Sequence, residues 1–142
     1  MSQVFKVGET TVWNPSNGVG RLFVRSADAL APLVNLPTGI GQAHSGDPDE
    51  WAVDMAAFEV FVGALADRYQ RSSHVILRSL MEGFIATALV LVERGGGRMP
   101  SQAADRGPEP SDFPVTTHGV GPLAPAGRLS ELSAAHSRAM PD

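Results

Sequence analysis

The chain has 142 residues, a net charge of −4 and no cysteine. This length favours a single domain, and the lack of cysteine excludes disulfides, thiolate metal sites and a thiol nucleophile. Basic and acidic residues are intermixed along the chain, so no basic stripe is available to contact phosphates, and we expect no nucleic-acid partner.

The first regular structure is predicted to be a β-hairpin. Residues 3–7 and 10–13 are rich in β-branched and aromatic side chains, and the Gly8-Glu9 pair between them is typical of a two-residue turn. A hairpin alone is marginally stable in water. We therefore expect one of its faces to pack on helices.

A helix is predicted to follow the hairpin. Asn14-Pro15 suits a helix start, and a start at Ser16 or Asn17 fits equally well. Apolar residues then recur at helical spacing, and Pro32 should end or kink the helix near Ala31.

Two more helices are predicted after a loop at residues 35–50, which are rich in Gly, Pro, Asp and Ser. Asp54 can cap the first of them, at residues 55–71, and the Ser72-Ser73 pair can cap the second, at residues 74–94.

The helix at residues 74–94 is the most apolar segment of the chain. Its apolar residues cover more than half of its circumference, which is typical of a central helix. The other predicted elements provide too little surface to cover it, so we expect a homodimer or another assembly formed through this helix. The candidate interface residues are Leu80, Phe84, Leu91, Trp13 and Trp51. For the two tryptophans, packing beside a helix start is the favoured interpretation, and an anchor at an interface is the alternative.

The composition changes at the run of glycines from Gly95 to Gly97. Residues 97–142 contain seven of the eleven prolines and a single aromatic residue, Phe113. A packed core in this segment would not offset its ordering entropy, so the sequence predicts a disordered C-terminal tail in which residues 129–140 can form a frayed helix. The predicted fold class is α+β, an N-terminal β-hairpin packed on a three-helix core at residues 1–96.

One polar stripe is the candidate site for chemistry. His74, Arg78 and Glu82 recur every four residues and share a helix face, while Glu59 and Asp67 lie on the polar face of the preceding helix. A carboxylate beside His74 would allow acid–base chemistry. The favoured interpretation is a surface ion pair, because the sequence supplies neither a nucleophile nor an oxyanion site. We therefore assign no catalytic residue.

Two other segments have residue types that bind ligands. Residues 14–20 follow a strand and open a helix, as phosphate-binding glycines do, but they lack the dinucleotide fingerprint. An acidic loop contains His44, Asp47, Asp49, Glu50 and Asp54. Its spacing is not that of a calcium loop. We interpret the first as a tight turn and the second as loop and capping residues, and expect no cofactor and no metal.

The chain is expected to be cytoplasmic and to have no membrane partner. Its N-terminus lacks a basic segment followed by an apolar one. The longest uncharged stretch is residues 83–92, whereas a membrane span needs about 20 apolar residues.

Four segments, residues 12–18, 36–39, 77–84 and 90–94, resemble a family of short uncharacterised proteins from high-GC Gram-positive bacteria. The resemblance covers residues 1–100 and leaves the tail outside. It implies a single N-terminal domain and no particular activity, cofactor or catalytic residue.

These observations favour a non-catalytic cytoplasmic interaction module, of an accessory, regulatory or immunity type, that binds another protein or itself. The alternative is a small-molecule-binding protein or enzyme that uses the His74/Arg78/Glu82 stripe and the turn at residues 14–20. An exposed apolar patch on the third helix would favour the first function, and a cavity that contains the stripe would favour the second.

Overall fold

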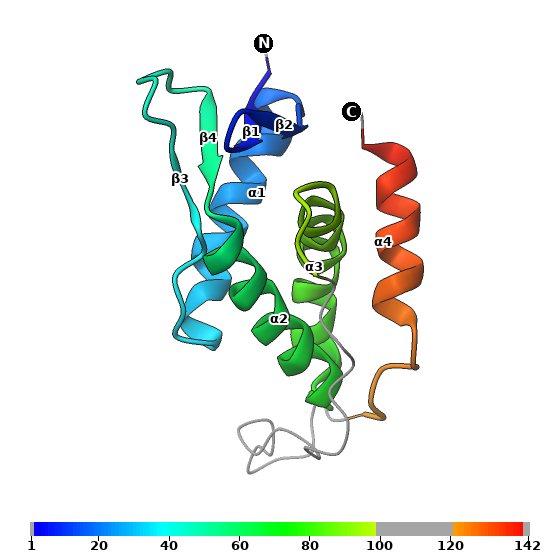
Figure 1. Cartoon of the computed structure of the whole chain (residues 1–142). Coiled ribbons are helices and arrows are strands. Elements are labelled where there is room, and N and C mark those ends of the chain that lie inside the picture. The colour runs from blue at the N-terminus through cyan, green and yellow to red at the C-terminus, as the bar shows by residue number, and fades with distance from the viewer. Residues whose placement is uncertain (1, 99–120, 141–142) are drawn as a thin grey trace.

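The computed structural model describes residues 2–98 and 121–140, which form a mixed sheet and a set of helices around one core (Figure 1). The strands are β1 (Val4–Val7), β2 (Thr10–Trp13), β3 (Ile40–Gln42) and β4 (Glu50–Val53). The helices are α1 (Asn17–Leu30), α2 (Met55–Arg71), α3 (Val75–Arg94) and α4 (Arg128–Ala139), and the short 3-10 helix Ala31–Leu33 follows α1. The predicted α+β class is confirmed.

The predicted hairpin forms one edge of a four-stranded sheet with the order β2-β1-β4-β3. The β1–β2 pair is antiparallel, the β1–β4 pair is parallel and the β3–β4 pair is antiparallel. A parallel pair requires a crossover connection, and α1 lies in that connection. The prediction that residues 35–50 form a loop is therefore wrong for β3 and for the start of β4. Both strands are short, and β3 contains a glycine.

The helix boundaries follow their caps. Ser16 is the N-cap residue of α1 and Asn17 its first residue, so the helix starts at the predicted Ser16 or Asn17 position and not at Asn14-Pro15. At α2 the Asp54 carboxylate accepts a hydrogen bond from the Ala57 N–H at 3.3 Å, as predicted. At α3 the N-cap residue is His74 and not a serine, because its Nδ1 accepts from the Leu77 N–H at 3.2 Å.

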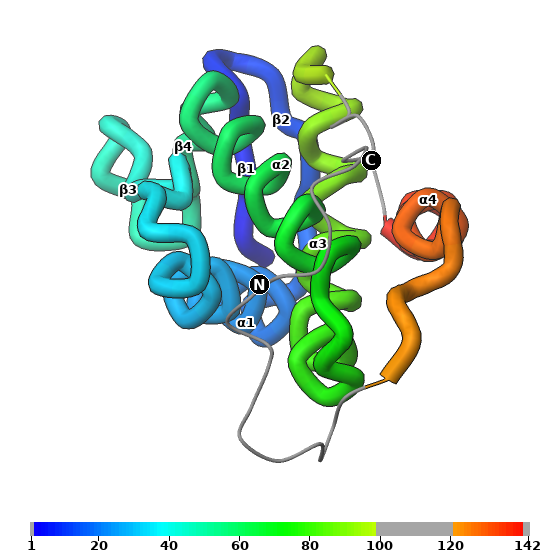
Figure 2. The backbone as a smooth tube through the Cα atoms, turned by 90° about the horizontal axis from the view of Figure 1, so that it is seen from below, coloured from blue at the N-terminus to red at the C-terminus, as the bar shows by residue number. Residues whose placement is uncertain are grey.

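Helix α3 is the centre of the core. Its buried residues are Met81, Phe84, Ile85, Ala86, Ala88, Leu89, Val90, Leu91 and Val92. It contacts α1, α2, α4 and β2, and Figure 2 shows α4 on one side of α3 with the rest of the fold on the other. By length and composition α3 is also the one helix of the described residues that could cross a membrane. Its burial is that of a core helix.

The C-terminal helix α4 packs against α3, so the prediction of disorder is wrong for residues 128–139. Leu129 and Ser133 are buried in this contact. The Arg94 guanidinium donates to the backbone carbonyls of Ser137 and Met140 at 3.4 and 3.1 Å. The described residues thus contain four α-helices: the three predicted for the core, and α4 where a frayed helix was predicted. Residues 99–120 of the predicted tail lie outside the described residues.

We predict that Leu129→Ala lowers the free energy of unfolding by about 2–4 kcal/mol, the usual cost of truncating a buried leucine. Leu129 is 6% exposed and belongs to the core cluster. The matched control is Leu123→Ala, because Leu123 is 46% exposed and should change stability by about 0.5 kcal/mol or less. Chemical denaturation of the full chain measures both. Equal effects of the two substitutions would show that α4 does not contribute to the core in solution.

Candidate functional site

Two residues of the polar stripe, His74 and Glu82, have separate structural roles. His74 caps α3 through its ring nitrogen. Glu82 accepts a hydrogen bond from the Tyr69 hydroxyl at 2.5 Å and one from Arg128 at 3.0 Å. Glu82 thus connects α2, α3 and α4, and it does not face His74 in an acid–base pair.

Glu59 and Asp67, which were predicted to lie on the polar face of the preceding helix, belong to α2. Asp67 forms an ion pair with Arg71, one turn further along the same helix, at 3.4 Å. Neither Glu59 nor Asp67 lines the groove described below, and the same holds for His74, Arg78 and Glu82. The stripe and these two carboxylates therefore do not come together in a shared site in that groove.

The hydrogen bond between Tyr69 and Glu82 shifts the pKa values of both side chains. Partial burial acts to raise the pKa of the Glu82 carboxyl, but hydrogen bonds from Tyr69 and Arg128 outweigh burial and hold this pKa below its usual value. Burial, together with the hydrogen bond to Glu82, raises the pKa of the Tyr69 hydroxyl to about 12. At neutral pH the phenol therefore remains a hydrogen-bond donor, and the Glu82 carboxylate that accepts its bond, with a lowered pKa, is too weak a base to remove its proton.

Tyr69 is the only tyrosine of the chain, so phenolate absorbance reports on it alone. We predict a titration midpoint of about 12 in the folded protein and of about 10 after denaturation. Because the folded-state pKa is raised, the stability linked to this group is complete below pH 10 and is lost as the pH rises through 12.

The control for this titration is Glu82→Gln. This change removes the negative charge and the carboxylate acceptor, so the midpoint of Tyr69 should move below that of the wild type. A wild-type midpoint near 10 in the folded protein would contradict the link between α2 and α3.

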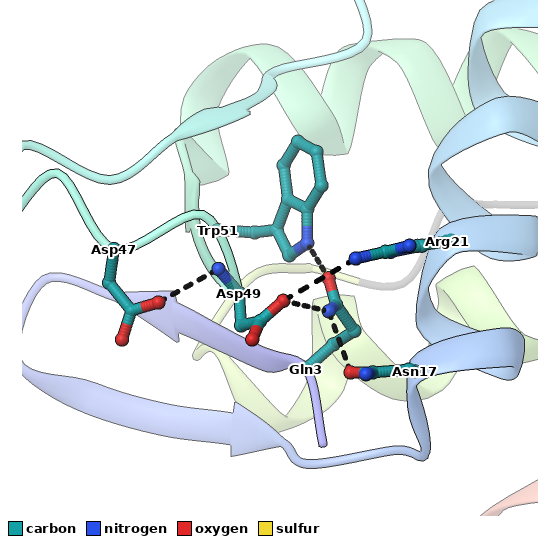
Figure 3. Close-up of polar contacts among 6 residues, drawn as sticks. All are labelled: Gln3, Asn17, Arg21, Asp47, Asp49 and Trp51. Carbon is teal, nitrogen blue, oxygen red and sulfur yellow. Dashed lines mark hydrogen bonds and ion pairs between the residues drawn. The ribbon is translucent and has the colours of Figure 1, made fainter. Parts of the chain in front are cut away.

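A second polar cluster joins the N-terminus, α1 and the segment before β4 (Figure 3). The fully buried Gln3 amide donates to Asn17 at 2.9 Å and to Asp49 at 2.7 Å. Its carbonyl accepts from the Trp51 indole N–H at 2.6 Å. Both donors and the acceptor of the Gln3 amide are thus used, and Arg21 lies 3.8 Å from Asp49. This cluster is a structural cross-link.

The cluster also explains a glycine in the turn predicted as a weak anion site. A Cβ atom at Gly20 would lie 2.5 Å from Cγ and 2.6 Å from Cβ of Gln3, whereas one at Gly18 would meet open space. Gly20 is therefore required for the close approach of Gln3 to α1. The glycine spacing that resembles a phosphate-binding loop has a packing cause.

We predict opposite effects of alanine at these two glycines. Gly20→Ala should destabilise the fold by about 1–3 kcal/mol, the usual cost of overpacking. Gly18→Ala should be neutral or stabilise by up to about 1 kcal/mol, because alanine favours the helix. Denaturation midpoints of the two variants measure the difference. Equal effects would show that Gln3 does not occupy the space beside Gly20.

The acidic residues of the loop between β3 and β4 contact one another and nearby residues. The Asp47 carboxylate accepts from the backbone N–H of Asp49 at 2.9 Å, and Glu50 pairs with Lys6 at 2.9 Å. Within the described residues, no group of three His, Cys, Asp or Glu side chains is arranged to hold a metal ion.

One concave surface of the described residues is a groove of about 640 Å³ between α1, α3 and α4. Its lining includes three buried aromatic residues that pack together: the rings of Trp13 and Phe23 are 5.3 Å apart, and those of Phe23 and Phe84 are 4.8 Å apart. Among the described residues that line it, none is Asp, Glu, Lys or Arg. The groove thus suits an apolar and uncharged occupant.

The rim of the groove is both apolar and exposed. Val19 and Leu22 on α1 are 50% and 66% exposed, and Leu80 on α3 is 73% exposed. Ile76, one helical turn before Leu80, is 58% exposed and extends the same apolar surface. A Cβ atom at Gly83, which also lines the groove, would meet open space.

The predicted interface residues separate into two groups. Leu80 is exposed on the rim, as an interface residue must be. Phe84 and Leu91 are 8% and 0% exposed, so they belong to the core, and only Phe84 reaches the groove. Trp13 is buried and lines the groove, and Trp51 is half-buried and bound to Gln3. The α1 side of the groove was not predicted, because it exists only where α1 meets α3.

The fold and this surface define a small α+β domain with an uncharged, apolar groove. Over residues 1–142 the chain matches the model of the Family of unknown function (DUF6086), and it belongs to that family. The match includes the C-terminal residues that the resemblance in the sequence left outside. No curated protein and no solved structure matches the chain.

Proposed function

We propose that this protein is a non-catalytic protein–protein interaction module, and that the groove between α1, α3 and α4 receives an apolar helix of its partner. The observation that supports this most is the exposed apolar rim beside an uncharged groove. Monomeric soluble proteins rarely leave such a surface uncovered unless it binds something.

The spacing of the groove residues suits a helix. On α3 the residues Leu80, Gly83, Phe84 and Thr87 recur as positions i, i+3, i+4 and i+7. Helix-in-groove recognition uses apolar anchors at this spacing on the partner. Gly83 leaves room for one such anchor, because its position faces open space.

The extent of the rim favours a macromolecule over a small ligand. A small molecule is held by a pocket that covers most of its own surface. Here the exposed residues Leu22 on α1 and Leu80 on α3 lie on two different walls of the groove, and the exposed Ile76 lies outside it. A second protein surface is needed to cover all three.

The enzyme alternative has less support. His74, Arg78 and Glu82 do not line the groove, and His74 and Glu82 have capping and cross-linking roles. We further propose that the protein acts in the cytoplasm of a high-GC Gram-positive bacterium, as an accessory, regulatory or immunity-type protein. The mixed charges along the chain support a protein partner over nucleic acid.

Affinity enrichment from host extract with quantitative mass spectrometry tests this proposal. Leu80→Glu places a charge on the groove rim, and we predict that it reduces capture of the partner by about tenfold or more, equivalent to about 1.4 kcal/mol. The matched control is Val60→Glu on α2, because Val60 is also exposed, at 59%, but lies outside the groove. It should leave capture unchanged.

The same variants distinguish a partner from a second copy. If the partner is another copy, light scattering of the wild type gives a mass above 15.0 kDa that falls to the monomer value in Leu80→Glu. Capture that persists in Leu80→Glu, or that is lost equally in Val60→Glu, would contradict the groove as the binding surface.

A further inference from the structure

Helix α4 buries few of its own residues. Only Leu129 and Ser133 are buried, and the N-cap residue is Gly127, which has no side chain to cap the helix. Helices of fewer than about 12–15 residues are marginal in water on their own, and α4 has 12. The order of α4 therefore depends on its contact with α3.

Two polar groups that hold α4 also have a partner in the rest of the fold. Glu82 binds Arg128 of α4 and also Tyr69 of α2. Arg94 donates to two backbone carbonyls at the end of α4 and also, at 3.2 Å, to the Val12 carbonyl of β2. Because Glu82 and Arg94 keep these second bonds when α4 leaves, its departure does not create the unpaired buried group that makes such changes costly.

Helix α4 covers one end of an apolar seam on α3. This α3 seam consists of residues that recur at spacings of four and three: Ile76, Leu80, Gly83, Thr87 and Val90. Residues at this spacing share one helix face, as in the contacts between helices of coiled coils. Ile76 and Leu80 at one end are exposed, whereas Val90 at the other end is buried.

The buried end of the α3 seam faces α4. The Thr87 hydroxyl bonds to the His136 ring at 2.8 Å, and Glu93 lines a surface pocket together with Ser137 of α4. At about 100° per residue, Val90 lies between Thr87 and Glu93 around the circumference of α3. Helix α4 therefore covers Val90.

A helix that docks along the whole α3 seam needs the space that α4 occupies. From Ile76 to Val90 the seam is about 21 Å long, at about 1.5 Å per residue, and α4 lies against its C-terminal half. The exposed half continues this existing helix contact, because His136 and Met140 of α4 also line the groove.

We propose that α4 is a displaceable occupant of the α3 seam, and that the partner helix takes its place. This inference rests on the proposed function and adds a regulatory role to it, because α4 competes with the partner. The residues of the α3 seam are uncharged. The facing side of the partner helix is therefore uncharged too, with apolar or small side chains one turn apart, as Leu129 and Ser133 are on α4.

The first test uses a fluorescent peptide of residues 127–140, with acetylated and amidated ends, as a copy of α4. Its anisotropy measures its affinity for the full chain. We expect the peptide to bind the Leu129→Ala chain about tenfold or more tightly than the wild type, because that substitution weakens the chain's own α4, which competes at a high effective concentration. The matched control is a peptide that itself carries Leu129→Ala, which should bind about tenfold more weakly.

The wild-type chain provides a measurement that does not depend on this variant. In nitrogen-edited NMR of the labelled full chain, an excess of unlabelled peptide should shift the amide signals of α4. The signals of β1 should stay in place, because β1 does not take part in the exchange.

The second test fixes α4 to α3. The chain has no cysteine, so Glu93→Cys with Ser137→Cys introduces the only two thiols, and a short bifunctional thiol reagent joins them. Both positions line the same pocket beside the α3–α4 contact, and neither lines the groove. We expect joining to reduce capture of the partner from host extract, and binding of the α4 peptide, by about tenfold or more relative to the unjoined double variant.

Each other outcome overturns the inference. These outcomes are equal affinity of the peptide for the two chains, binding to neither, wild-type α4 signals that do not shift, and peptide binding that persists after joining. Undiminished capture of the partner by the joined protein would show that α4 is a fixed wall of the groove. The interaction function is judged separately, since it stands or falls with Leu80→Glu.

Discussion

The structure depends on the need to cover helix α3. This helix is apolar around more than half of its surface, and water would meet that surface if any neighbouring element were missing. Helices α1, α2 and α4 and strand β2 each contact it. Val75, Ile76 and Leu80 form a part of its apolar surface that the described residues leave exposed. The groove is thus what remains when a small domain covers most of a helix that is apolar on more than one side.

The buried Gln3 side chain fixes the position of α1 beside that helix. It binds residues from α1 and from the segment that enters β4, and Gly20 allows the close approach. A buried amide is stable only when its donors and acceptor are paired, so these contacts leave little freedom in the position of α1. Because α1 forms one wall of the groove, this cross-link also determines the width of the groove.

The polar residues of α3 contribute to tertiary structure instead of chemistry. Glu82 joins Tyr69 on α2 to Arg128 on α4, and Thr87 contacts His136 on α4 at 2.8 Å. Helix α4 is polar along most of its length, and these bonds, with buried Leu129, hold it against α3. Its low apolar content made it resemble a disordered segment, because composition does not show that distant side chains supply hydrogen bonds.

The sequence by itself determined the α+β class, the hairpin, the ends of α2 and the central position of α3. These features depend on local turn and capping chemistry or on the periodicity of apolar residues within one element. Only the tertiary structure decided the pairing of β3 and β4, the docking of α4, the role of Glu82 and the groove between α1, α3 and α4. Each of these requires contact between residues far apart in the chain, and spacing within one segment carries no information about such contacts.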